Sequence, residues 1–242
     1  MNLIQTINSA LESSKKYFKI AFIGDSITSA DWIHPNWREI VEYVLKEELT
    51  KQLGDWKIPS WGIRCFNYGF DGSTTRDIKE FVSTGTIPTD LDLVIYLLGD
   101  NDMYIKVPDR EYLSNIKNTI SKFTCPIILC SNPTTNNPDV NKAYEKTYYQ
   151  SFLNLLSSPN LICLDLFKET QKYDLTSFYT LINVPGNEVT GVKPGEVDFI
   201  HPNRLGNAYI AKIILEQAFQ TPFNPEKYLE DLKNDIMDPT YQ

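Results

Sequence analysis

The sequence predicts an α/β protein in which helices cover both faces of a five-stranded parallel sheet. Short apolar runs alternate with helical patterns five times along the 242 residues. The strongest run, residues 91–98, is almost continuously apolar, as expected for a strand that is covered on both faces. Five such units are commonly arranged in the strand order 2-1-3-4-5, and we expect a three-layer sandwich with that order.

The first element along the chain is a predicted amphipathic helix within residues 1–17. Its apolar side chains recur at helical spacing: Leu3, Ile4, Ile7 and Leu11. The segment has no basic start followed by an apolar core, which a signal peptide requires. We therefore expect a cytoplasmic protein, unless a leader was removed beforehand.

The remaining elements follow from apolar runs and helical periodicity. Strands are expected near residues 18–23, 63–68, 91–98, 126–130 and 161–166. Helices are expected near residues 37–53, 75–82, 109–123, 139–156 and 204–219, and a short one near 225–233 in a surface tail at 220–242. Several glycines and prolines predict a loop at residues 175–197. No repeat divides the chain, so we expect one domain over residues 1–242 with its core at about 18–219.

Composition excludes several classes of protein. The net charge of −8 argues against a nucleic-acid partner, which needs clustered Lys and Arg. No apolar run approaches the ~20 residues of a membrane span.

The four cysteines lie in or beside apolar runs and form no close pair, so we interpret them as reduced core residues: Cys65, Cys125, Cys130 and Cys163. The sequence leaves the oligomeric state open.

A candidate nucleophile follows the first strand, which ends at Gly24. Ser26 lies two residues later in a short polar turn, where ligands bind in an open α/β sheet. In the order 2-1-3-4-5, the first strand lies between the second and the third. The loops that carry Ser26, Gly72 and Asn101 are therefore expected to meet at one edge of the sheet.

A serine hydroxyl is a weak nucleophile at neutral pH and needs a base. The chain has two histidines, His34 and His201. Asp198 precedes His201 by three residues, and a carboxylate at that spacing can orient an imidazole and stabilise its charged form. We interpret His34 as a loop residue, with no acidic partner expected.

Acyl transfer also needs donors that face the developing oxyanion. We expect three: the backbone N–H of Ser26, the backbone N–H of Gly72 and the side-chain amide of Asn101. Gly69 lies in the same turn as Gly72 and competes with it for this role.

Four blocks of sequence resemble the SGNH (GDSL-type) hydrolases: residues 24–26, 67–72, 99–102 and 198–202. The blocks have the family's order and span residues 18–217. The resemblance implies a flavodoxin-like α/β/α fold and ester hydrolysis through an acyl-enzyme, without metal or cofactor. It implies that Ser26 is the nucleophile, His201 the base and Asp198 its orienter. Ser26, Gly72 and Asn101 would form the oxyanion hole.

The sequence departs from the family at two positions, where it has Ile27 instead of leucine and Asp100 instead of a small or apolar residue. Four acidic residues flank the blocks: Asp25, Asp71, Asp100 and Asp102. If charged and unpaired, they would repel an anionic acyl donor. We therefore expect a neutral ester with a small acyl group, such as an acetylated sugar. Asp25 and Trp32 are candidate substrate contacts.

Two alternatives remain open at this point. The same fold could transfer the acyl group to an alcohol and exclude water. A protein of another class, a flavodoxin-like nucleotide-binding protein, could use the hydroxyls of Ser26, Thr28 and Ser29 to hold a phosphate. That interpretation gives Asp198 and His201 no role.

Overall fold

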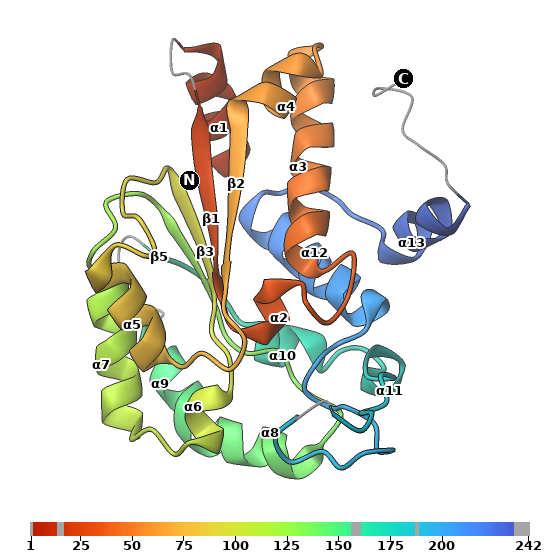
Figure 1. Ribbon diagram of the computed structural model, residues 1–242. Coiled ribbons are helices and arrows are strands. Elements are labelled where there is room, and N and C mark those ends of the chain that lie inside the picture. Colours follow the sequence, from red (N-terminus) through yellow and green to blue (C-terminus); the bar gives the residue numbers. More distant parts are fainter. Residues whose placement is uncertain (1, 14–16, 156–160, 187–188, 235–242) are drawn as a thin grey trace.

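The computed structural model describes residues 2–13, 17–155, 161–186 and 189–234. Within these residues, five parallel strands form one sheet with the order β2-β1-β3-β4-β5 (Figure 1). The strands are β1 (Phe18–Gly24), β2 (Ile63–Gly69), β3 (Leu93–Leu97), β4 (Ile127–Cys130) and β5 (Leu161–Leu164). The predicted fold class and strand order are confirmed.

Helices cover both faces of the sheet (Figure 1). On one face lie α1 (Leu3–Glu12), α3 (Trp37–Leu53) and α12 (Arg204–Ala218), with α13 (Pro225–Lys233) packed on α12. The other face carries α5 (Thr75–Thr84), α7 (Asp109–Ile120), α8 (Pro138–Tyr144), the π-helical segment η1 (Glu145–Tyr149) and α9 (Gln150–Leu153). Short helices follow the strands or connect elements: α2 (Ser26–Ser29), α4 (Lys57–Gly62), α6 (Asn101–Tyr104), α10 (Leu166–Thr170) and α11 (Leu175–Phe178).

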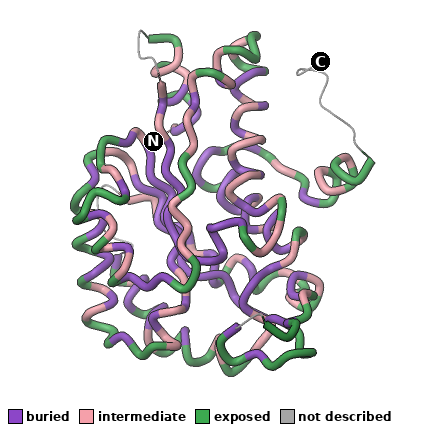
Figure 2. Tube along the Cα trace, in the orientation of Figure 1, coloured by how far each residue is buried: buried purple, intermediate pink, exposed green. Residues whose placement is uncertain are grey.

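The core consists of two apolar layers, one on each side of the sheet. Along β1, Ile20 and Phe22 face the layer of α1, α3 and α12, whereas Ala21 and Ile23 face the opposite layer. This alternation places apolar side chains on both faces, which explains why the strands are continuous apolar runs. Figure 2 shows the resulting buried centre of the sheet.

Local signals account for the helix ends. Asn36 and Glu39 form a capping box at the start of α3, and Gly54 ends the helix in a left-handed conformation. Asn203 caps α12, and Asn224 followed by Pro225 begins α13. These signals are why α3, α12 and α13 have almost the predicted bounds.

Three predictions of local structure are wrong. The helix expected at 139–156 contains a π-helical segment and ends at Leu153, and residue 156 lies outside the described residues. The strand expected at 161–166 ends at Leu164, and Leu166 begins α10. The loop expected at 175–197 includes α11 and a bridge between Ile182 and Val197, while residues 187–188 lie outside the described part.

The segments outside the predicted core stay close to expectation where they are described. In α1, Leu3, Ile4 and Ile7 are buried, so the predicted apolar face packs inward. Among residues 220–234, Thr221 and Pro225 are buried, Phe223, Tyr228 and Leu229 are partly buried against the core, and most of the others are exposed. Within the described residues, no helix is both long and apolar enough to span a membrane. The extent of the domain stays a prediction.

Candidate active site

Ser26 is the first residue of α2, at the carboxyl end of the central strand β1. The carboxylate of Asp25 caps this helix by accepting a hydrogen bond from the N–H of Ile27 at 3.0 Å. The short helix packs closely on the neighbouring strand, because a Cβ at Gly69 would lie 2.4 Å from the backbone nitrogen of Ser29. Glycine at position 69 therefore allows α2 to hold Ser26 in place.

A chain of hydrogen bonds joins Ser26, His201 and Asp198. His201 Nε2 lies 2.8 Å from Ser26 Oγ, and His201 Nδ1 lies 2.6 Å from Asp198 Oδ2. All three residues are buried, with exposed fractions of 9%, 5% and 2%. Ser26 and His201, which are 175 positions apart in the sequence, are thus in direct contact, as the sequence predicts.

The position of Asp198 is fixed by its second oxygen. Asp198 Oδ1 accepts hydrogen bonds from the backbone N–H groups of Ile200 at 2.7 Å and His201 at 3.1 Å. An ionised carboxylate only accepts hydrogen bonds, so the proton of a neutral imidazole belongs on Nδ1. His201 Nε2 is then free to accept the proton of the Ser26 hydroxyl.

Two of the backbone N–H groups expected to bind an oxyanion have no acceptor among the described residues. Among the described residues, neither the N–H of Ser26 nor that of Gly72 donates a hydrogen bond. The N–H of Gly69 is already donated to Asn67 Oδ1 at 2.9 Å. Gly72 has a φ of +70°, which glycine adopts without strain. The geometry therefore favours Gly72 over Gly69 as an oxyanion donor.

Asn101 lies at the same edge of the sheet, at the start of α6. Its side-chain nitrogen donates to Asp25 Oδ2 at 3.1 Å and to the backbone oxygen of Ser73 at 3.0 Å. Both hydrogens of the amide are thus directed at protein oxygens. To serve an oxyanion as well, Asn101 would have to share one of them with the substrate.

The structure corrects the expected charge around the site. Asp25, Asp100 and Asp102 are at most 3% exposed, and only Asp71 lies at the surface. Burial raises the pKa of Asp25 to about 7, and the charge of Asp100 adds to the shift. Burial also raises the pKa of Asp100 to about 7. These side chains therefore do not present a negative surface to the substrate.

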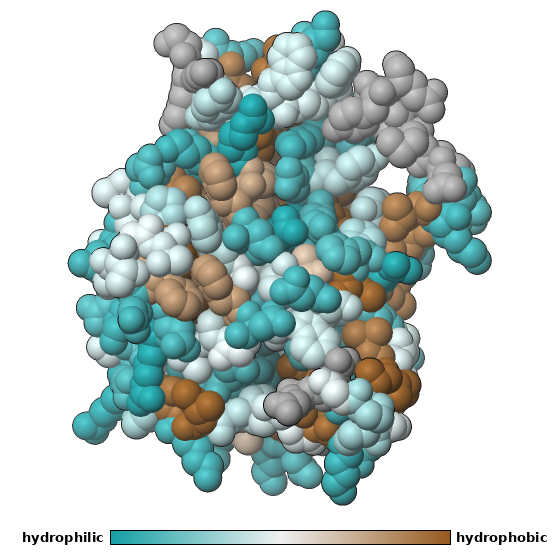
Figure 3. Space-filling model, in the orientation of Figure 1, coloured by the Kyte–Doolittle hydropathy of each residue, from teal (hydrophilic) through white to brown (hydrophobic). Residues whose placement is uncertain are grey.

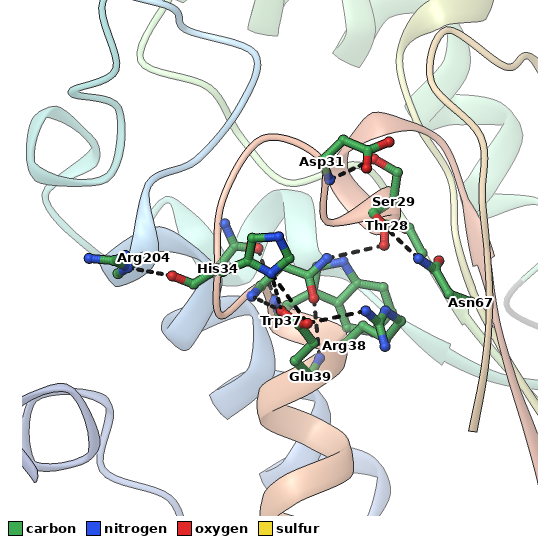
Figure 4. Close-up of polar contacts among 11 residues, drawn as sticks. Thr28, Ser29, Asp31, His34, Trp37, Arg38, Glu39, Asn67 and Arg204 are labelled. Carbon is green, nitrogen blue, oxygen red and sulfur yellow. Dashed lines mark hydrogen bonds and ion pairs between the residues drawn. The ribbon is translucent and has the colours of Figure 1, made fainter. Parts of the chain in front are cut away.

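The segment that follows α2 returns across the site to α3, and Figure 4 shows the polar contacts that hold it. Asn67 donates to the backbone oxygen of Ser29 at 2.7 Å, and Arg204 donates to that of His34. His34 has an acidic partner after all, because its Nδ1 lies 3.3 Å from Glu39 Oε2. The expectation of no such partner overlooked that the start of α3 turns Glu39 back toward the loop.

The hydroxyls proposed for phosphate binding are directed into the protein. Thr28 and Ser29 are buried, and Ser29 Oγ donates to the backbone oxygen of Ser26 at 3.2 Å. Ser26 Oγ is engaged by His201. This arrangement leaves no cluster of hydroxyls for a phosphate and contradicts the nucleotide-binding alternative.

Trp32 lies beside Ser26 and His201. Its indole is stacked on the His201 imidazole, and its Nε1–H donates to Asp71 Oδ2 at 3.1 Å. A cavity of about 10 Å³, the space of roughly one water molecule, lies between these residues. Its lining consists of Ser26, Ile27, Ala30, Trp32, Ile33, Asn36, His201, Pro202 and Asn207.

The surface near the site is partly apolar. Ile182, Val184 and Val197, from the segment that precedes His201, are each at least 41% exposed. Figure 3 shows hydrophilic and neutral residues over most of the visible face, with hydrophobic ones in several patches, one of them at the lower right, the end where α11 lies in Figure 1.

The fold and this geometry together define a class of protein. An alcohol, an imidazole and a carboxylate aligned at the carboxyl edge of a parallel sheet are the arrangement of a serine hydrolase. The chain belongs to the GDSL-like lipase/acylhydrolase family, whose model matches residues 20–214. It is thus a carboxylic ester hydrolase.

Solved structures agree on the fold. Axe2, an acetylxylan esterase from Geobacillus stearothermophilus, matches with a TM-score of 0.59 and 19% identity, over 86% of this chain and 95% of that one. The tail fiber protein gp63.1 of an E. coli phage matches with a TM-score of 0.61 and 16% identity, over 90% of this chain and 28% of that one. Comparison with curated protein sequences finds no match.

Proposed function

We propose that the chain removes short acyl groups, such as acetyl, from saccharides. The observation that carries the proposal is the hydrogen-bonded series Asp198–His201–Ser26 beside a cavity of about 10 Å³. Because this cavity leaves no room for a long chain beside Ser26, we expect the acyl group to be short. The fold shared with an acetylxylan esterase supports a saccharide as the alcohol portion.

In the proposed mechanism, Ser26 Oγ attacks the carbonyl carbon of the ester while His201 Nε2 takes the hydroxyl proton. Asp198 holds the imidazole in orientation and stabilises its positive charge. The negative oxygen accepts hydrogen bonds from the N–H groups of Ser26 and Gly72, with the amide of Asn101 as a third donor. His201 then gives its proton to the departing alcohol, and an acyl-enzyme remains on Ser26.

Water completes the cycle. His201 removes a proton from a water molecule, which attacks the acyl carbonyl, and the proton returns to Ser26 Oγ as the carboxylic acid leaves. If an alcohol took the place of water, the product would be a new ester. Product analysis with and without an added alcohol therefore distinguishes hydrolysis from acyl transfer.

The test is a series of p-nitrophenyl esters from acetate to octanoate, together with acetylated xylo-oligosaccharides. We expect kcat/KM to fall by about 10- to 200-fold for each step that overfills the pocket. Ser26→Ala should abolish turnover and covalent labelling by an organophosphonate. Ser29→Ala, a buried serine of the same helix, is the matched control and should still be labelled. Preference for octanoate would contradict the short-acyl assignment.

A further inference from the structure

Trp32 covers one face of the His201 imidazole. The two ring centroids lie 3.8 Å apart and the ring planes differ by 7°, which is a nearly parallel stack. The indole is itself held at its edge, where Nε1–H donates to Asp71 Oδ2 at 3.1 Å. Trp32 therefore contacts the base with its face and the loop of Gly72 with its edge.

The backbone around Trp32 is anchored at several points. Asn36 Nδ2 donates to the backbone oxygen of Thr28 at 3.1 Å, and the N–H of Trp37 donates to Asn207 Oδ1 at 3.0 Å. Arg204 holds the carbonyl of His34 (Figure 4). The indole also packs against Val189, Val192 and Ile200. These contacts come from α2, α12 and the segment before His201, and they fix where the indole lies.

The hydrogen bonds of His201 restrain the imidazole less against tilting out of its plane than against motion within that plane. Asp198 and Ser26 hold the imidazole at Nδ1 and Nε2, and a hydrogen bond to a ring nitrogen is directed along the plane of the ring. Tilting about the line through the two nitrogens disturbs them little. A parallel indole in van der Waals contact opposes that tilt. When the imidazole accepts a proton, the face of the indole also attracts the resulting cation.

We propose that Trp32 is a positioning residue for His201 and that Asp71 holds the indole parallel to the imidazole. This inference rests on the proposed function, in which His201 is the base. In this arrangement, Asp71 fixes the indole that is stacked on the His201 imidazole, and the adjacent Gly72 supplies an oxyanion donor. Trp32 is then more than a wall of the acyl pocket.

The stack has a signature that does not depend on activity. A ring stacked on an indole is shielded by its ring current, so the carbon-bound imidazole protons of His201 should resonate upfield. The chain has only two histidines, and His34→Gln assigns the signals. Trp32→Leu should return the His201 signals toward ordinary positions. Trp61→Leu, in the exposed part of α4 at the opposite end of the molecule (Figure 1), should leave them unchanged.

Kinetics then separate positioning from substrate binding. We expect Trp32→Leu to lower kcat for p-nitrophenyl acetate by about 10- to 100-fold with little change in KM. Trp32→Phe retains a stacking ring and should recover most of the loss. Asp71→Ala should lower kcat, whereas Asp71→Asn keeps an oxygen acceptor for the indole and should remain close to the native enzyme.

Three results would overturn the proposal. They are unshielded His201 signals in the native protein, a Trp32→Leu variant with altered KM alone, and a Trp32→Leu variant that turns over bulky esters faster than the native enzyme. The last two would make Trp32 a pocket wall or a gate. If Ser26→Ala kept its activity, the proposed function would fail instead, while the NMR result would stand.

Discussion

At the scale of single residues, the site depends on which polar groups are already engaged. Gly69 and Gly72 look alike in the sequence, but only the N–H of Gly69 is taken by Asn67. Asn101 has both amide hydrogens directed at Asp25 and Ser73. The N–H of Gly72 is therefore better prepared to bind an oxyanion than the N–H of Gly69 or the amide of Asn101.

Replacement of Asn101 tests its role as a donor. We expect Asn101→Ala to lower kcat by about 10²- to 10³-fold, the usual loss for one oxyanion donor. The measurement is kcat at saturating p-nitrophenyl acetate, with the melting temperature measured in parallel. A lower melting temperature with unchanged kcat would show that the amide only joins Asp25 to the loop of Ser73.

Asp100 provides a test of the buried carboxyls. Its pKa in the folded protein is about 7, against 3.8 as the ordinary value, mainly because of burial. Between these values, the unfolded chain loses the proton while the folded chain keeps it. The contribution of Asp100 to stability is therefore fully present below pH ~4 and is lost as the pH rises to about 7.

Asp100→Asn does not titrate and should escape this loss. We expect its melting temperature, relative to that of the native protein, to rise from pH 4 to pH 8. Asp139→Asn, at an exposed position of α8, is the control and should show no such trend. An equal effect of Asp100→Asn at both pH values would contradict the buried, neutral carboxyl.

At the scale of elements, the caps of helices also position the site. Asn36 accepts a hydrogen bond from the N–H of Glu39 at the start of α3, and its amide holds the backbone oxygen of Thr28 in α2. One side chain thus joins the helix that carries Ser26 to the helix that covers the sheet. Its sequence signature, Asn36 followed by Glu39, indicates only the cap.

Removal of this cap should affect both stability and activity. We expect Asn36→Ala to lower the free energy of unfolding by about 0.5–2 kcal/mol, the usual range for an N-cap, and to lower kcat as well. Asn224→Ala removes the cap of α13, away from the site, and should cost stability alone. Urea unfolding and ester hydrolysis measure the two effects. Unchanged kcat in Asn36→Ala would separate the cap from the site.

At the scale of the whole molecule, one sheet supports the entire site. The order β2-β1-β3 brings together the segments after three strands, which carry Ser26, Gly72 and Asn101. His201 joins them from the segment before α12, which packs on α3. The site is thus complete only when α12, from the C-terminal part of the chain, has packed on the layer that covers β1.

This dependence predicts cooperative unfolding of the core at residues 18–219. Tryptophan fluorescence, far-UV circular dichroism and loss of esterase activity should give the same urea midpoint. The reason is that the site residues come from elements on both sides of the shared sheet. Separate midpoints for fluorescence and circular dichroism would indicate two independently folding parts and contradict the predicted single domain.

Most of the fold could be predicted, because its signals are local. A continuous apolar run such as β3 reports burial on two faces, and caps such as Asn203 mark the ends of helices. Where local signals conflict, prediction was wrong. Pro59 and Gly62 are unfavourable inside a helix, so the sequence did not predict α4. The helical pattern of 139–156 did not indicate the π-helical turn within it.

The sequence by itself determined the α/β class, the strand order and the residue types of the site. Each follows from periodicity or from the spacing of a few blocks. Tertiary structure alone decided that Trp32 is stacked on His201, that Asp71 holds the indole and that Asn101 is engaged by Asp25. These pairs lie 39 to 169 positions apart, and no local periodicity encodes which distant groups meet when the layers pack.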